Sequence, residues 1–223
     1  MGADKELHHI QLSFRAVMDA MARPGRVYGL PATQGKKASR FGLEGPLETL
    51  VKMFIDQAVS FCVVAPDPAG IQDAIVAETH ARTAGQADAA FVVVPHGCDK
   101  ELAGQAIVQA SAGSFLSPEA GATVLLGCER LAFLTEREGA EAGDASLYWV
   151  SVEGPGVRDS HVFGIDCFDW VWARKRRGDE FPCGIEIILV DRQGQVAAIP
   201  RSSFLSVLAM EGGAEGEEAS WLM

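Results

Sequence analysis

The chain has 223 residues and a formal net charge of −11, and its length suits one large domain with a substantial core. Hydrophobic residues make up 48% of the sequence and charged residues 22%, as in ordinary globular proteins. A chain this acidic is repelled by phosphate backbones, which excludes nucleic acid as a general partner. The composition predicts a single α/β domain over residues 1–210 and a disordered, acidic, glycine-rich tail over residues 211–223.

The five cysteines are odd in number, scattered, and without a C-x-x-C pair: Cys62, Cys98, Cys128, Cys167 and Cys183. Cys62, Cys128 and Cys183 lie in or beside apolar runs, where a free thiol behaves as a small hydrophobic group. The first residues lack a signal-peptide core, and no apolar run approaches the ~20 residues of a membrane span. We therefore expect a reduced, cytoplasmic protein without a membrane partner.

The first half of the chain alternates helical and strand patterns. Apolar residues at three- and four-residue spacing predict one stripe on an N-terminal helix: Leu7, Ile10, Phe14, Val17, Met18 and Met21. A short strand at Arg26–Leu30 and a helix beginning at Pro46 follow. Continuous apolar runs at Val59–Ala65 and Ala89–Val94 predict buried strands, each followed by a helical stretch. This order is typical of βαβ units.

The second half predicts antiparallel pairing. Two strands, Ala122–Glu136 and Ala145–Val157, flank a polar loop at residues 137–144 and are expected to form a hairpin. A helix over Asp166–Phe181, capped by Asp166, precedes a final hairpin that turns at Asp191–Gln195. The whole pattern predicts a three-layer α/β/α sandwich with a mixed sheet and helices on both faces.

The final hairpin holds one acid, Glu186, and ends in Pro-Arg-Ser-Ser. A buried carboxylate is costly unless it is paired, so Glu186 is either a tuned acid or a strand-end carboxylate reached by water or an arginine. We favour the second interpretation. Arg201 with Ser202 and Ser203 could bind a phosphate or carboxylate. The alternative is an arginine that pairs with a nearby acid.

Two further patterns carry charge or chemistry. The basic cluster Arg174, Lys175, Arg176 and Arg177 ends the predicted helix, where cations complement the helix dipole. The alternative is a contact surface for an acidic partner or a nucleotide triphosphate. His96 follows a predicted strand at its carboxyl end, where α/β proteins often place sites. Residues 117–121 are expected to form a structural turn. The sequence contains no zinc-ligand spacing, nucleophile elbow or phosphate loop.

Five motifs, in matching order, resemble the H subunit of the carbon–phosphorus lyase system, the PhnH family: SFRAVMDAMARPGRV, SPEAGATVLL, GPGV, FPCGIEIILV and AAIPRSS. The resemblance implies a homodimer that joins the G, I and J subunits in a core complex. It also implies an accessory, non-catalytic role while a phosphonate is transferred onto the ribose of ATP, giving ribose 1-methylphosphonate 5-triphosphate. The same resemblance implies the fold of the large domain of pyridoxal-phosphate-dependent transferases, without that cofactor.

The lysines agree with a cofactor-free relative, since we expect all of them in polar loops or on helices and none in a pocket: Lys5, Lys36, Lys37, Lys52, Lys100 and Lys175. One rival is a stand-alone, transferase-like enzyme with a site around His96, Glu186 and Arg201. Another is a regulatory module that binds a small anion. We expect Arg201→Ala to weaken phosphonate or nucleotide handling and to leave the fold intact.

Overall fold

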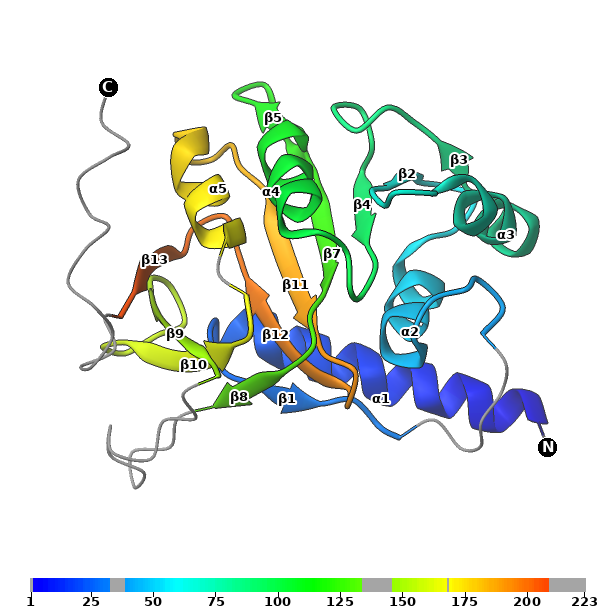
Figure 1. Cartoon of the computed structure of the whole chain (residues 1–223), viewed down its shortest axis with the longest axis horizontal. Coiled ribbons are helices and arrows are strands. Elements are labelled where there is room, and N and C mark those ends of the chain that lie inside the picture. Colours follow the sequence, from blue (N-terminus) through cyan, green and yellow to red (C-terminus); the bar gives the residue numbers. More distant parts are fainter. Residues whose placement is uncertain (1, 33–38, 134–145, 168, 209–223) are drawn as a thin grey trace.

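A mixed sheet forms the centre of the computed structural model, which describes residues 2–32, 39–133, 146–167 and 169–208 (Figure 1). Its strand order is β1-β12-β11-β7-β4-β2-β3. The bounds, in that order, are Tyr28–Gly29, Gln195–Ile199, Glu186–Val190, Thr123–Gly127, Phe91–Val94, Ser60–Val63 and Arg82–Thr83. Strands β11, β7, β4, β2 and β3 are parallel, and β12 runs antiparallel to both of its neighbours. The predicted mixed sheet and the final hairpin are confirmed.

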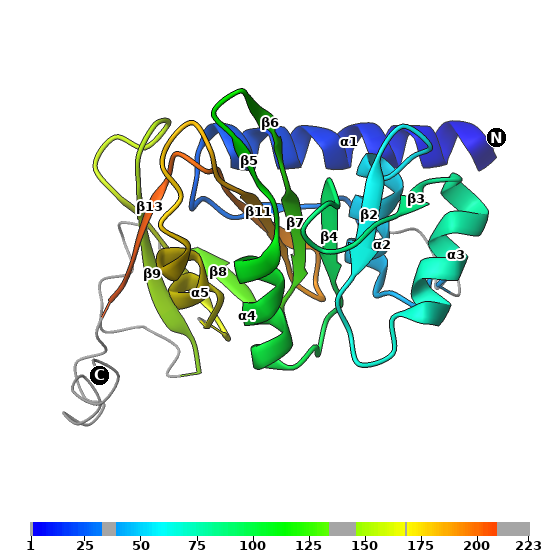
Figure 2. The ribbon, with the colours of Figure 1, turned by 90° about the horizontal axis from the view of Figure 1, so that it is seen from above.

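Helices cover both faces of this sheet, as the sequence predicted (Figure 2). The helices are α1 (Gly2–Ala22), α2 (Gly45–Phe54), α3 (Ala69–Thr79), α4 (Lys100–Gln109) and α5 (Asp169–Arg177). Successive strand residues face opposite cores: Val93 and Leu125 pack with α1, α2 and α3, whereas Val92 and Val124 pack with α4 and α5. Both faces are apolar because both are buried, which explains the continuous apolar runs.

A second, antiparallel sheet packs beside α5, and the sequence did not predict it. Its order is β13-β9-β10-β8, with bounds Phe204–Val207, Tyr148–Glu153, His161–Ile165 and Leu131–Phe133. The expected hairpin between Ala122–Glu136 and Ala145–Val157 is wrong. The first stretch is split between two sheets as β7 and β8, and β10 lies between β8 and β9 and pairs with both. The loop at residues 137–144 and the tail at 211–223 lie outside the described residues.

Two local expectations are also corrected. Ser117–Gly121 is not a turn but strand β6, which pairs with β5 (Ala112–Ser114) in a separate hairpin. Asp166 does not cap α5: its carboxylate accepts hydrogen bonds from the main-chain N–H groups of Glu129 and Arg130, both at 3.0 Å. Asp166 therefore ties the connection between the two sheets to the segment before α5.

The apolar stripe of α1 is divided between core and surface. Val17 is buried and Ile10 is half-buried, whereas Leu7, Phe14 and Met18 are exposed along a second line of the helix. The expectation of one stripe is therefore wrong, because residues 7, 14 and 18 lie well off the face that packs on α2 and β12. Across the described residues, no helix combines the length and the apolar character needed to span a membrane.

Candidate functional site

The carboxyl ends of β4 and β7 form a small pocket with the first turns of α4 and α5. Its volume is about 110 Å³. We name it the cysteine pocket, and its lining residues with titratable side chains are Cys98, Lys100, Cys128, Glu129, Asp166, Cys167 and Asp169. Open α/β sheets usually bind ligands at the carboxyl ends of their strands. The cysteine pocket therefore lies where this type of fold most often places a site.

The thiols of the cysteine pocket are not activated. Burial raises the pKa of Cys167 to about 12 and raises the pKa of Cys128 well above its ordinary value. Cys98 donates a hydrogen bond from Sγ to the carbonyl of Val64 at 3.5 Å, and burial also raises its pKa. The nucleophile and metal ligand is the thiolate, so these groups are inert at neutral pH. Within the residues that the structure describes, no three acidic, histidine or cysteine side chains form a metal site.

One lysine does line this pocket, which corrects the expectation that none would. Lys100 begins α4, its side chain is 61% exposed, and its Nζ lies 4.0 Å from the Asp169 carboxylate. A lysine activated for covalent chemistry is desolvated or placed beside another cation. Lys100 is largely exposed and lies beside a carboxylate, so it has neither of these features.

His96 lies just beyond the carboxyl end of β4, as predicted, but it is half-buried and packs closely against Gly127 of β7. Gly127 allows this close packing, because a Cβ at that position would lie 2.6 Å from the main-chain nitrogen of His96. Neither ring nitrogen has a hydrogen-bond partner among the described residues. Burial and the positive charge of Arg192 lower the pKa of His96, although the main chain at Val190 and Asp191 partly opposes this. His96 is therefore a neutral, packed imidazole.

At the opposite edge of the sheet, Glu186 and Arg201 form an ion pair. Arg201 donates to the Glu186 carboxylate from Nε at 2.6 Å and from its main-chain N–H at 2.8 Å. Its Nη1 donates to the carbonyls of Pro118 and Pro182. Our preferred interpretation of Glu186, a strand-end acid reached by an arginine, is confirmed. Arg201 joins β11 to the β5–β6 hairpin and to the loop before β11.

The site proposed for a stand-alone enzyme does not assemble. Glu186 aligns with Thr123 in β7, and Thr123 aligns with Phe91 in β4. His96 is five residues beyond Phe91, which is about 16 Å along an extended chain. His96 and Glu186 therefore lie at opposite ends of the sheet and cannot act on one substrate.

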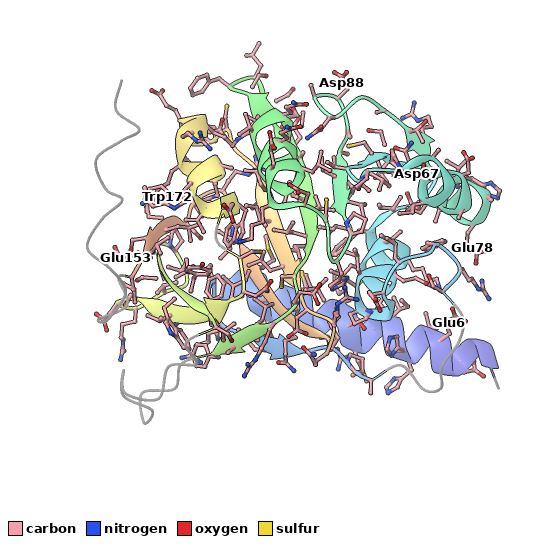
Figure 3. All side chains as sticks on the ribbon, viewed as in Figure 1. Glu6, Asp67, Glu78, Asp88, Glu153 and Trp172 are labelled. Atoms are coloured by element: carbon pink, nitrogen blue, oxygen red, sulfur yellow. The ribbon has the colours of Figure 1, made fainter. Side chains whose placement is uncertain are left out.

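The four cations at the end of α5 fall into two groups, one packed against the protein and one exposed to solvent. Arg177 is 6% exposed at its side chain, pairs with Asp179 at 2.6 Å and donates to the carbonyls that end α4. Arg174 donates to main-chain carbonyls of the turn before β13. Lys175 and Arg176 are exposed, and the Lys175 ammonium lies 5.1 Å from the ring centre of Trp172, which points outward from α5 (Figure 3). Of the four cations in this cluster, Lys175 and Arg176 are the two that are exposed to solvent.

Residues of the basic cluster of α5 and of the Pro-Arg-Ser-Ser segment line the same hollow. A hollow of about 240 Å³ lies between α5, β13 and the loop before β11. We name it the arginine hollow, and its lining includes Val171, Arg174, Lys175, Arg201, Ser203 and Phe204. Ser202, predicted as an equal contact, is not part of the lining.

Sequence reasoning missed Asp179 and Gly184 as further parts of the hollow's wall. Gly184 has φ +138°, and a Cβ there would lie 3.0 Å from Cβ of Arg201. A glycine just before an apolar strand was the available signal, since glycine often marks a close approach of two chain segments.

The fold and its two edges define an α/β protein with buried, protonated thiols at one edge of the sheet and an arginine-lined hollow at the other. A comparison with curated proteins finds no match for the chain. A family model described as bacterial phosphonate metabolism protein (PhnH) matches residues 1–206. The chain belongs to this family, and its role therefore lies in bacterial phosphonate metabolism.

Proposed function

We propose that the chain is a non-catalytic accessory subunit of a carbon–phosphorus lyase core complex in the cytoplasm. It would support the transfer of a phosphonate onto the ribose of ATP together with the G, I and J subunits, and form a homodimer when alone. Family membership and the order of the motifs support this role. We further propose that residues 1–210 form one domain. This domain would be related to the large domain of pyridoxal-phosphate-dependent transferases but would lack the cofactor.

The observation that carries the proposal is a contrast between polar and apolar groups. The candidate catalytic side chains are packed or paired: both ring nitrogens of His96 are buried, and Glu186 is held by Arg201. In contrast, the tip of the β5–β6 hairpin exposes Phe115 at 68% and Leu116 at 96%. This hairpin protrudes from the body in both views (Figures 1 and 2). Large apolar side chains on a protruding tip are typical of a protein interface.

We assign the hairpin tip to a groove on another subunit of the complex. Leu116→Asp places a charge where an apolar contact is expected, so recovery of the G, I and J subunits with the tagged chain should fall at least about tenfold. Thermal unfolding should not change, because Leu116 is exposed. Glu119→Gln, on the exposed side of the same hairpin, is the matched control and should keep full recovery.

The accessory role has its own test. The isolated chain, mixed with ATP and methylphosphonate, should release no adenine. Adenine release by the pure chain would overturn the accessory role. Full recovery of the other subunits with Leu116→Asp would instead overturn the assignment of the hairpin.

A further inference from the structure

The arginine hollow carries more positive charge than its own acids can balance. Two of the arginines around it have a carboxylate partner: Arg201 pairs with Glu186, and Arg177 pairs with Asp179, each at 2.6 Å. Arg174 is in no ion pair among the described residues, although it lies in the wall. In a chain with a net charge of −11, this is a local concentration of positive charge that favours an anion.

The guanidinium of Arg174 is held in a fixed position. Its Nη1 donates to the carbonyl of Ser203 at 2.9 Å, and its Nη2 donates to the carbonyls of Pro200 at 2.8 Å and Arg201 at 3.3 Å. Burial lowers the pKa of Arg174, and the charges of Glu186 and Asp179 partly oppose this. A half-buried cation whose hydrogen-bond acceptors are main-chain carbonyls gains from a bound anion.

Ser203 supplies a second, independent indication of a ligand. The residue is 4% exposed and lines the hollow. Its main-chain N–H donates to Pro200 at 3.0 Å, but its Oγ makes no hydrogen bond among the described residues. Buried hydroxyl groups normally have a partner. The Oγ can donate to an anion that also contacts Arg174.

Part of the lining is apolar. Val171, Ile185, Phe204 and Leu205 line the hollow together with the charged groups. A ligand that fits both parts has an oxyanion group at one end and a small carbon substituent at the other.

We propose that the arginine hollow binds a tetrahedral phosphorus oxyanion, with an organophosphonate as its preferred form. Arg174 and Arg201 face the oxygens, Ser203 donates a hydrogen bond, and the apolar wall contacts the carbon attached to phosphorus. The preference for a phosphonate over inorganic phosphate comes from this apolar wall and from the family's role in phosphonate metabolism. The accessory-subunit proposal is not needed for it.

The test uses the isolated full-length chain and calorimetric titration with methylphosphonate, inorganic phosphate and ATP. Methylphosphonate should bind with one site per chain and more tightly than phosphate. Ser203→Ala should weaken binding about tenfold or more, which corresponds to one hydrogen bond to a charged group. Thermal unfolding of this variant should be unchanged, because the Ser203 Oγ makes no hydrogen bond with the residues that the structure describes.

Ser202→Ala is the matched control, since Ser202 is adjacent but does not line the hollow. It should keep the affinity of the wild type. Tighter binding of ATP than of methylphosphonate, weakened by Ser203→Ala, would support the shared phosphoryl chemistry and name a nucleotide as its source. The absence of binding by all three probes, or equal affinity in Ser203→Ala, would overturn the site. Neither of those two results bears on adenine release or on subunit recovery, so the two proposals fail separately.

Discussion

The two edges of the large sheet contain different chemistry. At the carboxyl edge, the cysteine pocket contains protonated thiols, and His96 beside it is a neutral imidazole. At the opposite edge, the arginine hollow contains cations, an ion pair and the buried Ser203 hydroxyl, which has no hydrogen-bond partner within the described part of the chain. The carboxyl edge is where an α/β fold usually places its site. Here the fold-level expectation and the side-chain chemistry disagree, and the side chains decide where a charged ligand can bind.

The difference has a physical origin in the chain's connections. After β11 and β12 the chain crosses to the small sheet through the turn that contains Arg201 and Ser203, and the carbonyls of this turn are held by Arg174 of α5. An arginine of α5 therefore holds the turn that connects the two sheets. A hollow that arises between such cations has a positive potential, which favours the binding of an anion.

The largest expected effect is the loss of the Arg201 ion pair. Arg201→Ala leaves Glu186 without its partner in a setting where the two side chains are 17% and 18% exposed. It also removes donors from the carbonyls of Pro118 and Pro182. We expect the free energy of unfolding to fall by about 3 kcal/mol, measured by denaturant titration at neutral pH.

The same measurement tests the expectation that Arg201→Ala leaves the fold intact, and Ser203→Ala is the better probe of anion binding. Arg176→Ala is the control, because Arg176 is exposed on the same edge. Its effect should stay within about 0.5 kcal/mol. If the two variants were equally stable, the description of Arg201 as a connection between structural elements would be wrong.

The next effect is the low reactivity of the thiols at the carboxyl edge. Because burial raises the pKa of Cys167 to about 12, alkylation of the folded chain at mildly alkaline pH should be about a hundredfold slower at Cys167 than at a free cysteine. Mass spectrometry after timed alkylation measures this rate at each residue. Alkylation in denaturant is the control and should remove the protection. Rapid labelling of Cys167 in the folded chain would mean that this edge contains an activated group after all.

Much of the large sheet could be predicted from sequence, because its strands are buried on both faces. Continuous apolar runs identify β2, β4, β7, β11 and β12, and their alternation with helices predicts parallel pairing. The small sheet could not be predicted, since β10 contains Gly164 and pairs with residues of β8 that lie 30 to 34 positions earlier in the chain. Pairing between distant segments leaves no local signal in the sequence.

The arginine hollow could likewise be predicted only in part from the sequence. Residue types identified Arg201 and Ser203 as candidates for anion contact, and helix position identified Arg174. Their convergence depends on how α5 packs against the turn before β13, which is a tertiary contact. Adjacent serines also look equivalent in a sequence, yet only Ser203 is buried in the hollow wall.

The smallest expected effect is a pH dependence from His96. Its pKa in the folded chain lies below its ordinary value of about 6.5, first because of burial and then because of Arg192, with Glu44 partly opposing. As the pH falls through about 6.5, the unfolded chain gains a proton at His96 that the folded chain does not, so the free energy of unfolding decreases. His96→Phe should remove up to about 1 kcal/mol of this decrease between neutral pH and about pH 5, allowing for partial solvent screening. The control is His8→Phe on the exposed side of α1, which retains His96 and should keep the wild-type profile. An unchanged profile in His96→Phe would mean that His96 takes up a proton in the folded chain, and the carboxyl edge would then hold a charge comparable to those of the arginine hollow.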